Sequence, residues 1–222
     1  MTVHMKREIE KLKQMLMSLC EIAEVNLRQA VKSIKQRDTK LAEKVIEADI
    51  EVDHTEVEIE EECLKILALY QPVAIDLRFI ITVLKINNDL ERIGDLAVNL
   101  AEHSIFLAGQ DKVELPFDFD SMTEKTESML RKSLDSLVNM NTKLAYEVCA
   151  ADDEIDAMDR NTHLKVRNAT HTHPQQIECL IHLLSASGHL ERIADHATNI
   201  AEDVIYMIEG RIVRHKAEDY KS

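Results

Sequence analysis

The stretch Leu90-Glu91-Arg92-Ile93-Gly94-Asp95 returns 100 positions later as Leu190-Glu191-Arg192-Ile193-Ala194-Asp195. The agreement continues beyond both stretches, pairing Ala97 with Ala197, Asn99 with Asn199, Ala101 with Ala201 and Glu102 with Glu202. The chain is therefore one structural unit written twice. The best-matched part of this unit is rich in carboxylates and amides, which are the groups that bind hard cations.

A second pair of matching stretches precedes the first pair in each half. The positions are Leu41, Ala42, Val45, Ala48, Asp49, Glu51 and Asp53, which recur as Leu144, Ala145, Val148, Ala151, Asp152, Glu154 and Asp156. Each half then reads as helix, helix, proline and helix, with Pro72 and Pro174 in equivalent places. We expect an all-α fold of two tandem three-helix bundles, 1–110 and 121–222, joined by a linker over 111–120.

Apolar periodicity and capping residues set the expected helix limits. The six expected helices run over about 5–36, 39–70, 71–108, 121–139, 142–171 and 173–210. Asp38 and Asn141 can cap the second and fifth helices, and Gly210 suits the end of the last one. Pro72 and Pro174 are expected in the first turns of the third and sixth helices, where a missing N–H costs nothing.

Composition excludes several classes of protein. A formal net charge of −14 would repel the phosphate backbone of nucleic acid, so we expect no nucleic-acid partner. No Cys-x-x-Cys pair is present, and Cys20, Cys63, Cys149 and Cys179 are expected to be packed, reduced thiols. Neither a signal peptide nor an apolar run of spanning length is apparent. We therefore expect a cytoplasmic protein without membrane insertion, able at most to dock peripherally on membrane proteins.

Pairs of carboxylates four residues apart are the leading candidate site. They are Asp49 with Asp53, Glu91 with Asp95, Asp152 with Asp156, and Glu191 with Asp195. Residues at this spacing share one helix face, where like charges repel and a bound cation would relieve the repulsion. Asn99 and Asn199 fall close to the same stripes. Such oxygen-rich sites suit divalent or trivalent ions, with iron, Mg²⁺, Mn²⁺ and Zn²⁺ as the candidates.

A solvated acidic face without any metal would give the same spacing, and this alternative stays open at the level of sequence. His182, His189 and His196 are seven residues apart, too far along one helix to share an ion, and are expected at a polar face or interface. A ferritin-like oxidase is disfavoured, because the single Glu51-x-x-His54 motif has Ala157 in place of histidine in the second half. No nucleotide-binding loop or hydrolase motif is apparent, so an enzyme is not expected.

The doubled stretches, together with Pro72-Val73-Ala74-Ile75-Asp76-Leu77-Arg78, resemble the signature segments of the phosphate-uptake regulator family, PhoU. The resemblance covers nearly the whole chain. The second half departs from it at Pro174-Gln175-Gln176-Ile177-Glu178-Cys179-Leu180, which lacks the Asp-Leu-Arg of the first. His189 also stands where the first half has Asp89, so the two sites need not be equivalent.

The resemblance implies a cytoplasmic, non-enzymatic negative regulator of phosphate homeostasis that forms a homodimer. Its implied partners are the ATPase of the phosphate ABC transporter and a sensor histidine kinase, with Asp76 and Arg78 as partner-binding residues. It also implies metal clusters held by the Glu/Asp-x-x-x-Asp motifs. The alternative function is a metal-storage or metal-redox protein built on carboxylate clusters.

Overall fold

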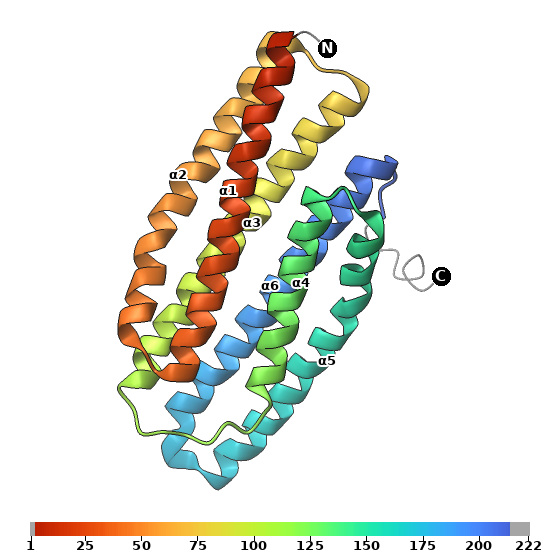
Figure 1. Cartoon of the computed structure of the whole chain (residues 1–222). Coiled ribbons are helices and arrows are strands. Elements are labelled where there is room, and N and C mark those ends of the chain that lie inside the picture. Colours follow the sequence, from red (N-terminus) through yellow and green to blue (C-terminus); the bar gives the residue numbers. More distant parts are fainter. Residues whose placement is uncertain (1–2, 214–222) are drawn as a thin grey trace.

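Six long helices make up residues 3–213, the part of the chain that the computed structural model describes (Figure 1). They are α1 (Val3–Gln36), α2 (Thr39–Tyr70), α3 (Ala74–Ala108), α4 (Phe119–Val138), α5 (Thr142–Thr172) and α6 (Ile177–Glu209). A short 3₁₀ turn, η1 (Pro174–Gln176), precedes α6, and no strand occurs within residues 3–213. The predicted all-α fold is confirmed, and each helix lies within four residues of its predicted limits.

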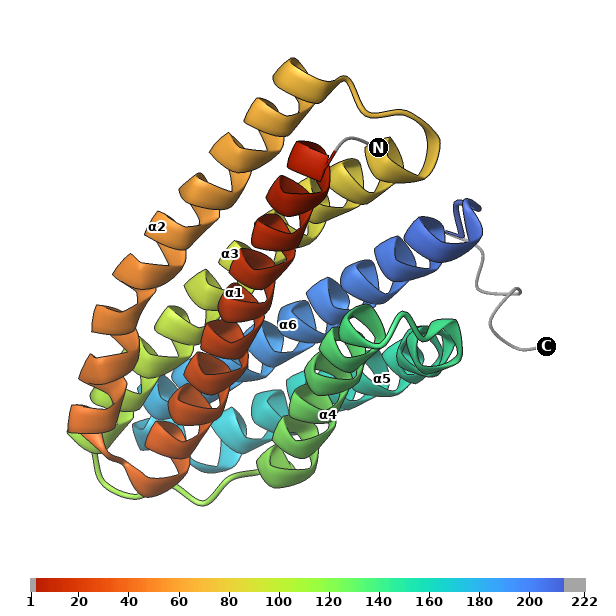
Figure 2. The ribbon, with the colours of Figure 1, turned by 45° about the horizontal axis from the view of Figure 1, so that its top comes forward.

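The helices form two three-helix bundles, α1–α3 and α4–α6, whose last helices lie side by side (Figures 1 and 2). We call the contact between α3 and α6 the seam. The two helices run antiparallel along it, since Lys85 meets Asp203 and His103 meets His182. The seam is reinforced by a smaller contact between α1 and α4. Each of α3 and α6 therefore belongs to its own bundle and also joins the two bundles.

The cores are aliphatic, as the scarcity of aromatic residues predicts. Fully buried side chains come from every helix, among them Leu12, Ile59, Ile86, Leu130 and Leu190. Burying a side chain of this kind contributes roughly 1.5–3 kcal/mol. All four cysteines are buried and unpaired. The buried apolar residues determine which face of each helix points into the core. The carboxylate pairs lie on the other faces.

Three predicted helix ends are confirmed. Asp38 accepts a hydrogen bond from the backbone N–H of Leu41, and Asn141 accepts one from Leu144, so both side chains cap their helices. Gly210 ends α6 with φ of 73°, a left-handed conformation that glycine adopts without steric cost.

The predicted role of the prolines is wrong for the first half. Pro72 precedes Val73, the N-cap of α3, so it lies in the connection rather than in the first helical turn. Pro174 opens η1, and the α-helix begins only at Ile177. The residue before a proline disfavours the helical conformation, which separates both prolines from the preceding helices.

Residues 109–118 connect α3 to α4 along one end of the molecule (Figure 1). The division into units 1–110 and 121–222 with a linker over 111–120 stays a prediction, and residues 1–2 and 214–222 of those units lie outside the described residues. None of the helices within 3–213 combines the length and the apolar character needed to cross a bilayer.

Candidate metal centres

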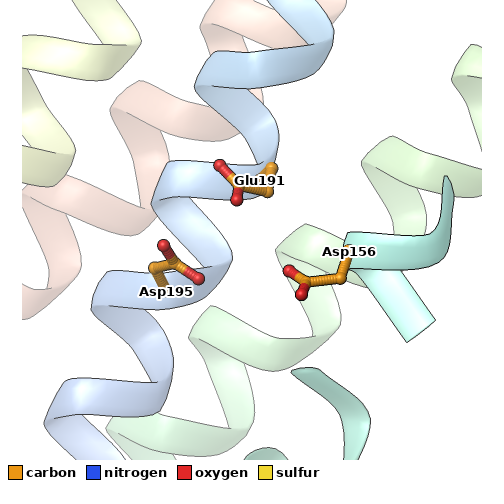
Figure 3. A group of neighbouring side chains, drawn as sticks. All are labelled: Asp156, Glu191 and Asp195. Carbon is orange, nitrogen blue, oxygen red and sulfur yellow. The ribbon is translucent and has the colours of Figure 1, made fainter. Parts of the chain in front are cut away.

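The predicted carboxylates of the second half converge between α5 and α6. Asp156 on α5 points toward Glu191 and Asp195 on α6 (Figure 3). One oxygen from each of these three side chains lies within 4.8 Å of the others. Among residues 3–213, this is the one group of three or more acidic, histidine or cysteine side chains whose donor atoms come so close. We call it, with Asp152 and Asp159 beside it, the α5/α6 cluster.

Crowding and burial raise the proton affinity of the α5/α6 cluster. Burial, followed by the charges of Asp195, Asp159, Asp156 and Asp152, raises the pKa of Glu191 to about 7. Asp195 also has a raised pKa, first from burial and then from Asp152 and Asp156. Carboxylates that hold protons near neutral pH are incompletely compensated by the protein, and a bound cation would supply the missing charge.

The first half places the equivalent residues between α2 and α3. Burial, and then the charges of Asp53 and Asp95, raise the pKa of Asp49 to about 6. The pKa of Glu91 is raised by burial and by Asp95, against the opposing effect of Arg92. Asp49 Oδ1 and Glu91 Oε2 are buried without a hydrogen-bond partner. We call this group, with Glu56 beside it, the α2/α3 cluster.

Gly94 allows α2 to approach α3 closely at the α2/α3 cluster. A β-carbon on Gly94 would stand 3.0 Å from Asp49 Oδ1 and 3.1 Å from Val52 Cγ1, inside normal contact distance. The second half has Ala194 at this position, buried against the core. There Asp152 lies close enough to accept a hydrogen bond from the Thr198 hydroxyl at 3.0 Å. The two clusters therefore differ in the residue at this helix contact and in their hydrogen bonding.

Arginines lie at the rims of both clusters and neutralise part of the charge. Arg92 lies 3.3 Å from Glu91 and 3.2 Å from Asp95, and Arg160 lies 3.2 Å from Asp156. All these arginine side chains are more than half exposed, so the pairs are weak and exchange with water. They leave inner oxygens such as Asp49 Oδ1 uncompensated.

Two members of the clusters were not predicted from the sequence. Glu56 on α2 and Asp159 on α5 each lie one turn beyond the predicted pair of their helix. Asn87 of α3 donates a hydrogen bond to Glu56 Oε1 at 3.3 Å, and Ser187 of α6 donates one to Asp159 Oδ1 at 2.8 Å. The sequence signal was available, because Glu56 and Asp159 are separated by the same interval as Asp53 and Asp156.

The predicted asparagines take other places. Asn199 donates a hydrogen bond to Asp89 Oδ1 at 3.3 Å, so its amide is engaged across the seam. Asn99 lies half-buried one turn after Asp95. Of the predicted partner-binding residues, Arg78 packs its guanidinium against Gly210 at the end of α6, while Asp76 lies half-buried in the first turn of α3.

The donor set fits a hard or borderline cation. The α5/α6 cluster brings carboxylate oxygens from two helices close together. The α2/α3 cluster holds two buried carboxylate oxygens without hydrogen-bond partners, which are groups that such ions satisfy. Mg²⁺, Mn²⁺ and iron accept all-oxygen donors, and Zn²⁺ accepts carboxylates as well. Metal binding by these residues stays a prediction.

The fold and the clusters define a class of protein: a doubled three-helix bundle with an acidic cluster in each half. The family model described as "PhoU domain" matches twice, over residues 16–104 and 119–204. The chain belongs to the PhoU family, as the sequence motifs predicted. This is a family of regulatory accessory proteins rather than of enzymes.

Relatives match almost from end to end. The chain is 36% identical to the "Phosphate-specific transport system accessory protein PhoU homolog" of Aquifex aeolicus, covering 95% of each protein. It is 34% identical to the relative of the same name from Clostridium acetobutylicum, covering 93% of this chain and 94% of that one. The crystal structure of PhoU from Pseudomonas aeruginosa superimposes with a TM-score of 0.89 at 32% identity, covering 93% of this chain and 99% of that chain.

Proposed function

We propose that this protein regulates phosphate uptake as an accessory protein of a phosphate transport system. The observation that carries the proposal is the match of both halves to one family, whose curated relatives are named for that system. The relatives match over more than nine-tenths of both chains, so the proposal applies to the chain along nearly its whole length.

The proposed partners are the transporter ATPase and a sensor histidine kinase, and the proposed setting is the cytoplasm. The protein would act as a homodimer that binds the kinase and favours its repressed state when phosphate is ample. Such a shift requires different affinities for the two kinase states, and not merely tight binding. Asp76 supports a role for the start of α3, since it is a charged group on a turn with exposed Val73 and Ile75.

Metal ions are proposed as a structural part of this regulator. The α2/α3 and α5/α6 clusters each join two helices of one bundle, so an ion in either would tie those helices together. The resulting rigidity would keep the outer surfaces of the bundles in the shape that a partner recognises. Raised pKa values at Asp49 and Glu191 support this, because they mark charge that the protein alone does not compensate.

The experiment that tests the regulatory role is deletion of the gene in its own host, followed by assay of a phosphate-starvation reporter. Deletion is expected to raise the reporter in phosphate-rich medium, and the intact gene is expected to restore repression. A reporter that stays repressed after deletion, at every phosphate level, would contradict the proposal. Capture of the ATPase and of the kinase domain by purified protein tests the two partners separately.

The alternative, a metal-redox protein, has a separate test. The α5/α6 cluster supports this alternative in one respect, because carboxylates can bridge iron ions. The chain has a single Glu-x-x-His motif, and its histidine, His54, is exposed on α2. Purified protein would have to oxidise Fe²⁺ in air faster than buffer does. We expect it to match buffer, and faster oxidation would favour the alternative.

A further inference from the structure

The outer face of α2 carries apolar side chains that no other described helix covers. Ile50, Val57 and Leu64 are 62%, 51% and 54% exposed, and successive members lie seven residues apart. Seven residues are close to two helical turns, so the three side chains line one face over about 21 Å. Within residues 3–213, α2 packs only against α1 and α3, and it lies at the edge of the molecule (Figures 1 and 2). We call Ile50, Val57 and Leu64 the α2 stripe.

The duplicated helix α5 has charged residues in place of the α2 stripe. The equivalent positions, 103 residues later, are Asp153, Arg160 and Arg167. All three are exposed, as the stripe members are. One scattered apolar residue on a surface needs no explanation, but an aligned row of three on only one of two duplicated helices does. The row indicates a contact surface that belongs to the first half alone.

Carboxylates border the α2 stripe on both sides. Positions three and four residues after a stripe member lie to either side of the line that joins it to the next member. Asp53 and Glu60 occupy one side, His54 and Glu61 occupy the other, and all four are exposed. Between residues 45 and 64 the sequence has nine Asp or Glu residues and no Lys or Arg. The face is therefore an apolar row inside a strongly negative border.

The nearest basic side chains are engaged elsewhere. Lys65 lies 2.6 Å from Glu8 and 2.8 Å from Glu62, so its charge is held between α1 and α2. Lys11 of α1 also pairs with Glu62, at 2.9 Å. Both bases thus serve a buried carboxylate on the α1 side of the helix. The negative charge beside the α2 stripe stays available to the bases of a partner.

We propose that the α2 stripe binds an amphipathic helix of a regulatory partner protein, a helix that carries Lys and Arg beside its apolar face. Its apolar side chains would pack between Ile50, Val57 and Leu64, and its bases would meet the carboxylates of the border. Docking of an amphipathic helix through anchors at helical spacing is a recurring mode of protein recognition. The inference rests on the proposed regulatory function for the identity of the partner, and on the structure for the chemistry of the surface.

Charge disfavours the other occupants of this face. Two α2 stripes placed together would bring two acidic borders into contact, which costs free energy. Anionic lipid headgroups are repelled in the same way. The outer face of α5 in a second copy has one exposed large apolar side chain, Leu164, so it offers no row to match the three stripe members. A basic amphipathic helix, in contrast, covers the apolar row and relieves the repulsion among its bordering carboxylates.

Binding of a fluorescent peptide tests the surface directly. The probe is a synthetic helix of about 14 residues, the length that spans the stripe, with leucines on one face and lysines elsewhere. We expect Val57→Gln combined with Leu64→Gln, which removes apolar surface without changing charge, to weaken binding at least about tenfold. Leu164→Gln on α5 is the matched control and should bind as the parent does. Added salt should weaken binding by the parent protein.

A second variant tests the border independently of the apolar row. Glu60→Gln combined with Glu61→Gln keeps the α2 stripe and removes two exposed charges. It should weaken peptide binding about threefold or more. Circular dichroism checks the folding of both double variants. If the Val57 and Leu64 variant does not fold, the Glu60 and Glu61 variant and the salt dependence decide the matter.

Capture of the transporter ATPase and of the cytoplasmic part of the kinase extends the test to the proposed partners. We expect Val57→Gln combined with Leu64→Gln to lose a partner that the parent captures, and Leu164→Gln to keep it. Capture that is unchanged in the double variant would contradict the surface while the proposed function stands. A parent protein that captures neither would contradict the proposed partners, and peptide binding would then decide the surface alone.

Two results would overturn the proposal. One is a peptide that the parent protein does not bind, or binds no more tightly than the folded double variant does. The other concerns a second copy of the chain, which sedimentation examines. Self-association of the parent that is lost in Val57→Gln combined with Leu64→Gln would show that a second copy covers the α2 stripe.

Discussion

Asp49 Oδ1 lies 3.0 Å from the point where a β-carbon on Gly94 would stand, so the absence of a side chain at Gly94 sets the spacing of α2 and α3. Val52 Cγ1 lies 3.1 Å from the same point, and Val52 is fully buried. We predict that Gly94→Ala pushes Asp49 away and weakens metal binding at the α2/α3 cluster. Overpacking of about 1–3 kcal/mol should outweigh the helix-propensity gain of about 1 kcal/mol. Urea unfolding and metal stoichiometry measure the two effects.

Ala194→Gly is the matched control for that variant. It removes a buried methyl group at the equivalent position of the second half. We expect it to lower stability by about 1 kcal/mol through helix propensity while metal binding at the α2/α3 cluster is kept. Equal metal binding by Gly94→Ala and the parent protein would show that the close approach is not needed at that cluster.

The stability of the metal-free protein should fall as pH rises through neutrality. The pKa of Glu191 is about 7 in the folded protein, against 4.5 for an ordinary glutamate. The folded state thus holds this proton more tightly than the unfolded state does. The contribution of this proton to the free energy of unfolding is complete below about pH 4.5 and is lost as pH rises through about 7. Urea unfolding in the presence of a chelator, at pH 5 and pH 8, measures the difference.

Glu191→Gln should flatten that pH dependence. Each like-charge contact removed at pH 8 is expected to contribute roughly 0.2–0.5 kcal/mol of stability to the metal-free variant. Glu178→Gln, exposed in the first turn of α6, is the control and should keep the parent's profile. A profile that rises with pH in the chelated parent protein would be inconsistent with the raised pKa.

Metal addition should stabilise the protein through both acidic clusters. An ion at 100 times its dissociation constant adds about 2.7 kcal/mol to the free energy of unfolding. Asp156→Asn combined with Asp195→Asn should remove the metal-dependent stabilisation that comes from the α5/α6 cluster and keep the part that comes from the α2/α3 cluster. Thermal unfolding with and without Mn²⁺ measures each share. An unchanged melting temperature in the parent protein at saturating Mn²⁺ or Fe²⁺ would count against metal binding.

Replacing Asp76 and Arg78 one at a time should distinguish a role in partner binding from a role in stability. The Arg78 guanidinium packs on Gly210, and its buried Nε lies at the junction of the two halves, so Arg78→Ala is expected to lower stability by about 1–2 kcal/mol. Asp76→Ala is expected to change stability by less than about 0.5 kcal/mol while weakening capture of the transporter ATPase. Thermal unfolding and pull-down measure the two effects. Loss of capture by Arg78→Ala alone, without loss of stability, would reverse these roles.

Most of the fold was predictable because its signals are local. Helical periodicity, the caps at Asp38 and Asn141 and the terminal glycine at Gly210 each act within a few residues. The division into two equivalent three-helix bundles was predicted from the internal repeat, and no single segment indicates it. Pro72 was misplaced because a proline fits both the first helical turn and the connection before it.

The candidate sites were predictable in part. The spacing of four residues identified the carboxylate pairs, whereas Glu56 and Asp159 required following the helix face one turn further. The contact between His103 and His182 at the seam could not be predicted from sequence, because the two residues meet only when α3 and α6 pack. Asn199 was taken for a cluster residue since it lies two turns after Glu191, but its amide is engaged across the seam by Asp89.

The polar pairs of the seam give its two helices a single alignment. Purely aliphatic surfaces could slide past each other, but a shift of one helical turn, about 5.4 Å, would part Lys85 from Asp203 and His196 from Asp89. Asp203 is almost wholly enclosed, so such a displaced arrangement would strand its charge at high cost. The duplicated units are thereby held in one mutual register, and the interval between the two acidic clusters is a fixed length of the molecule.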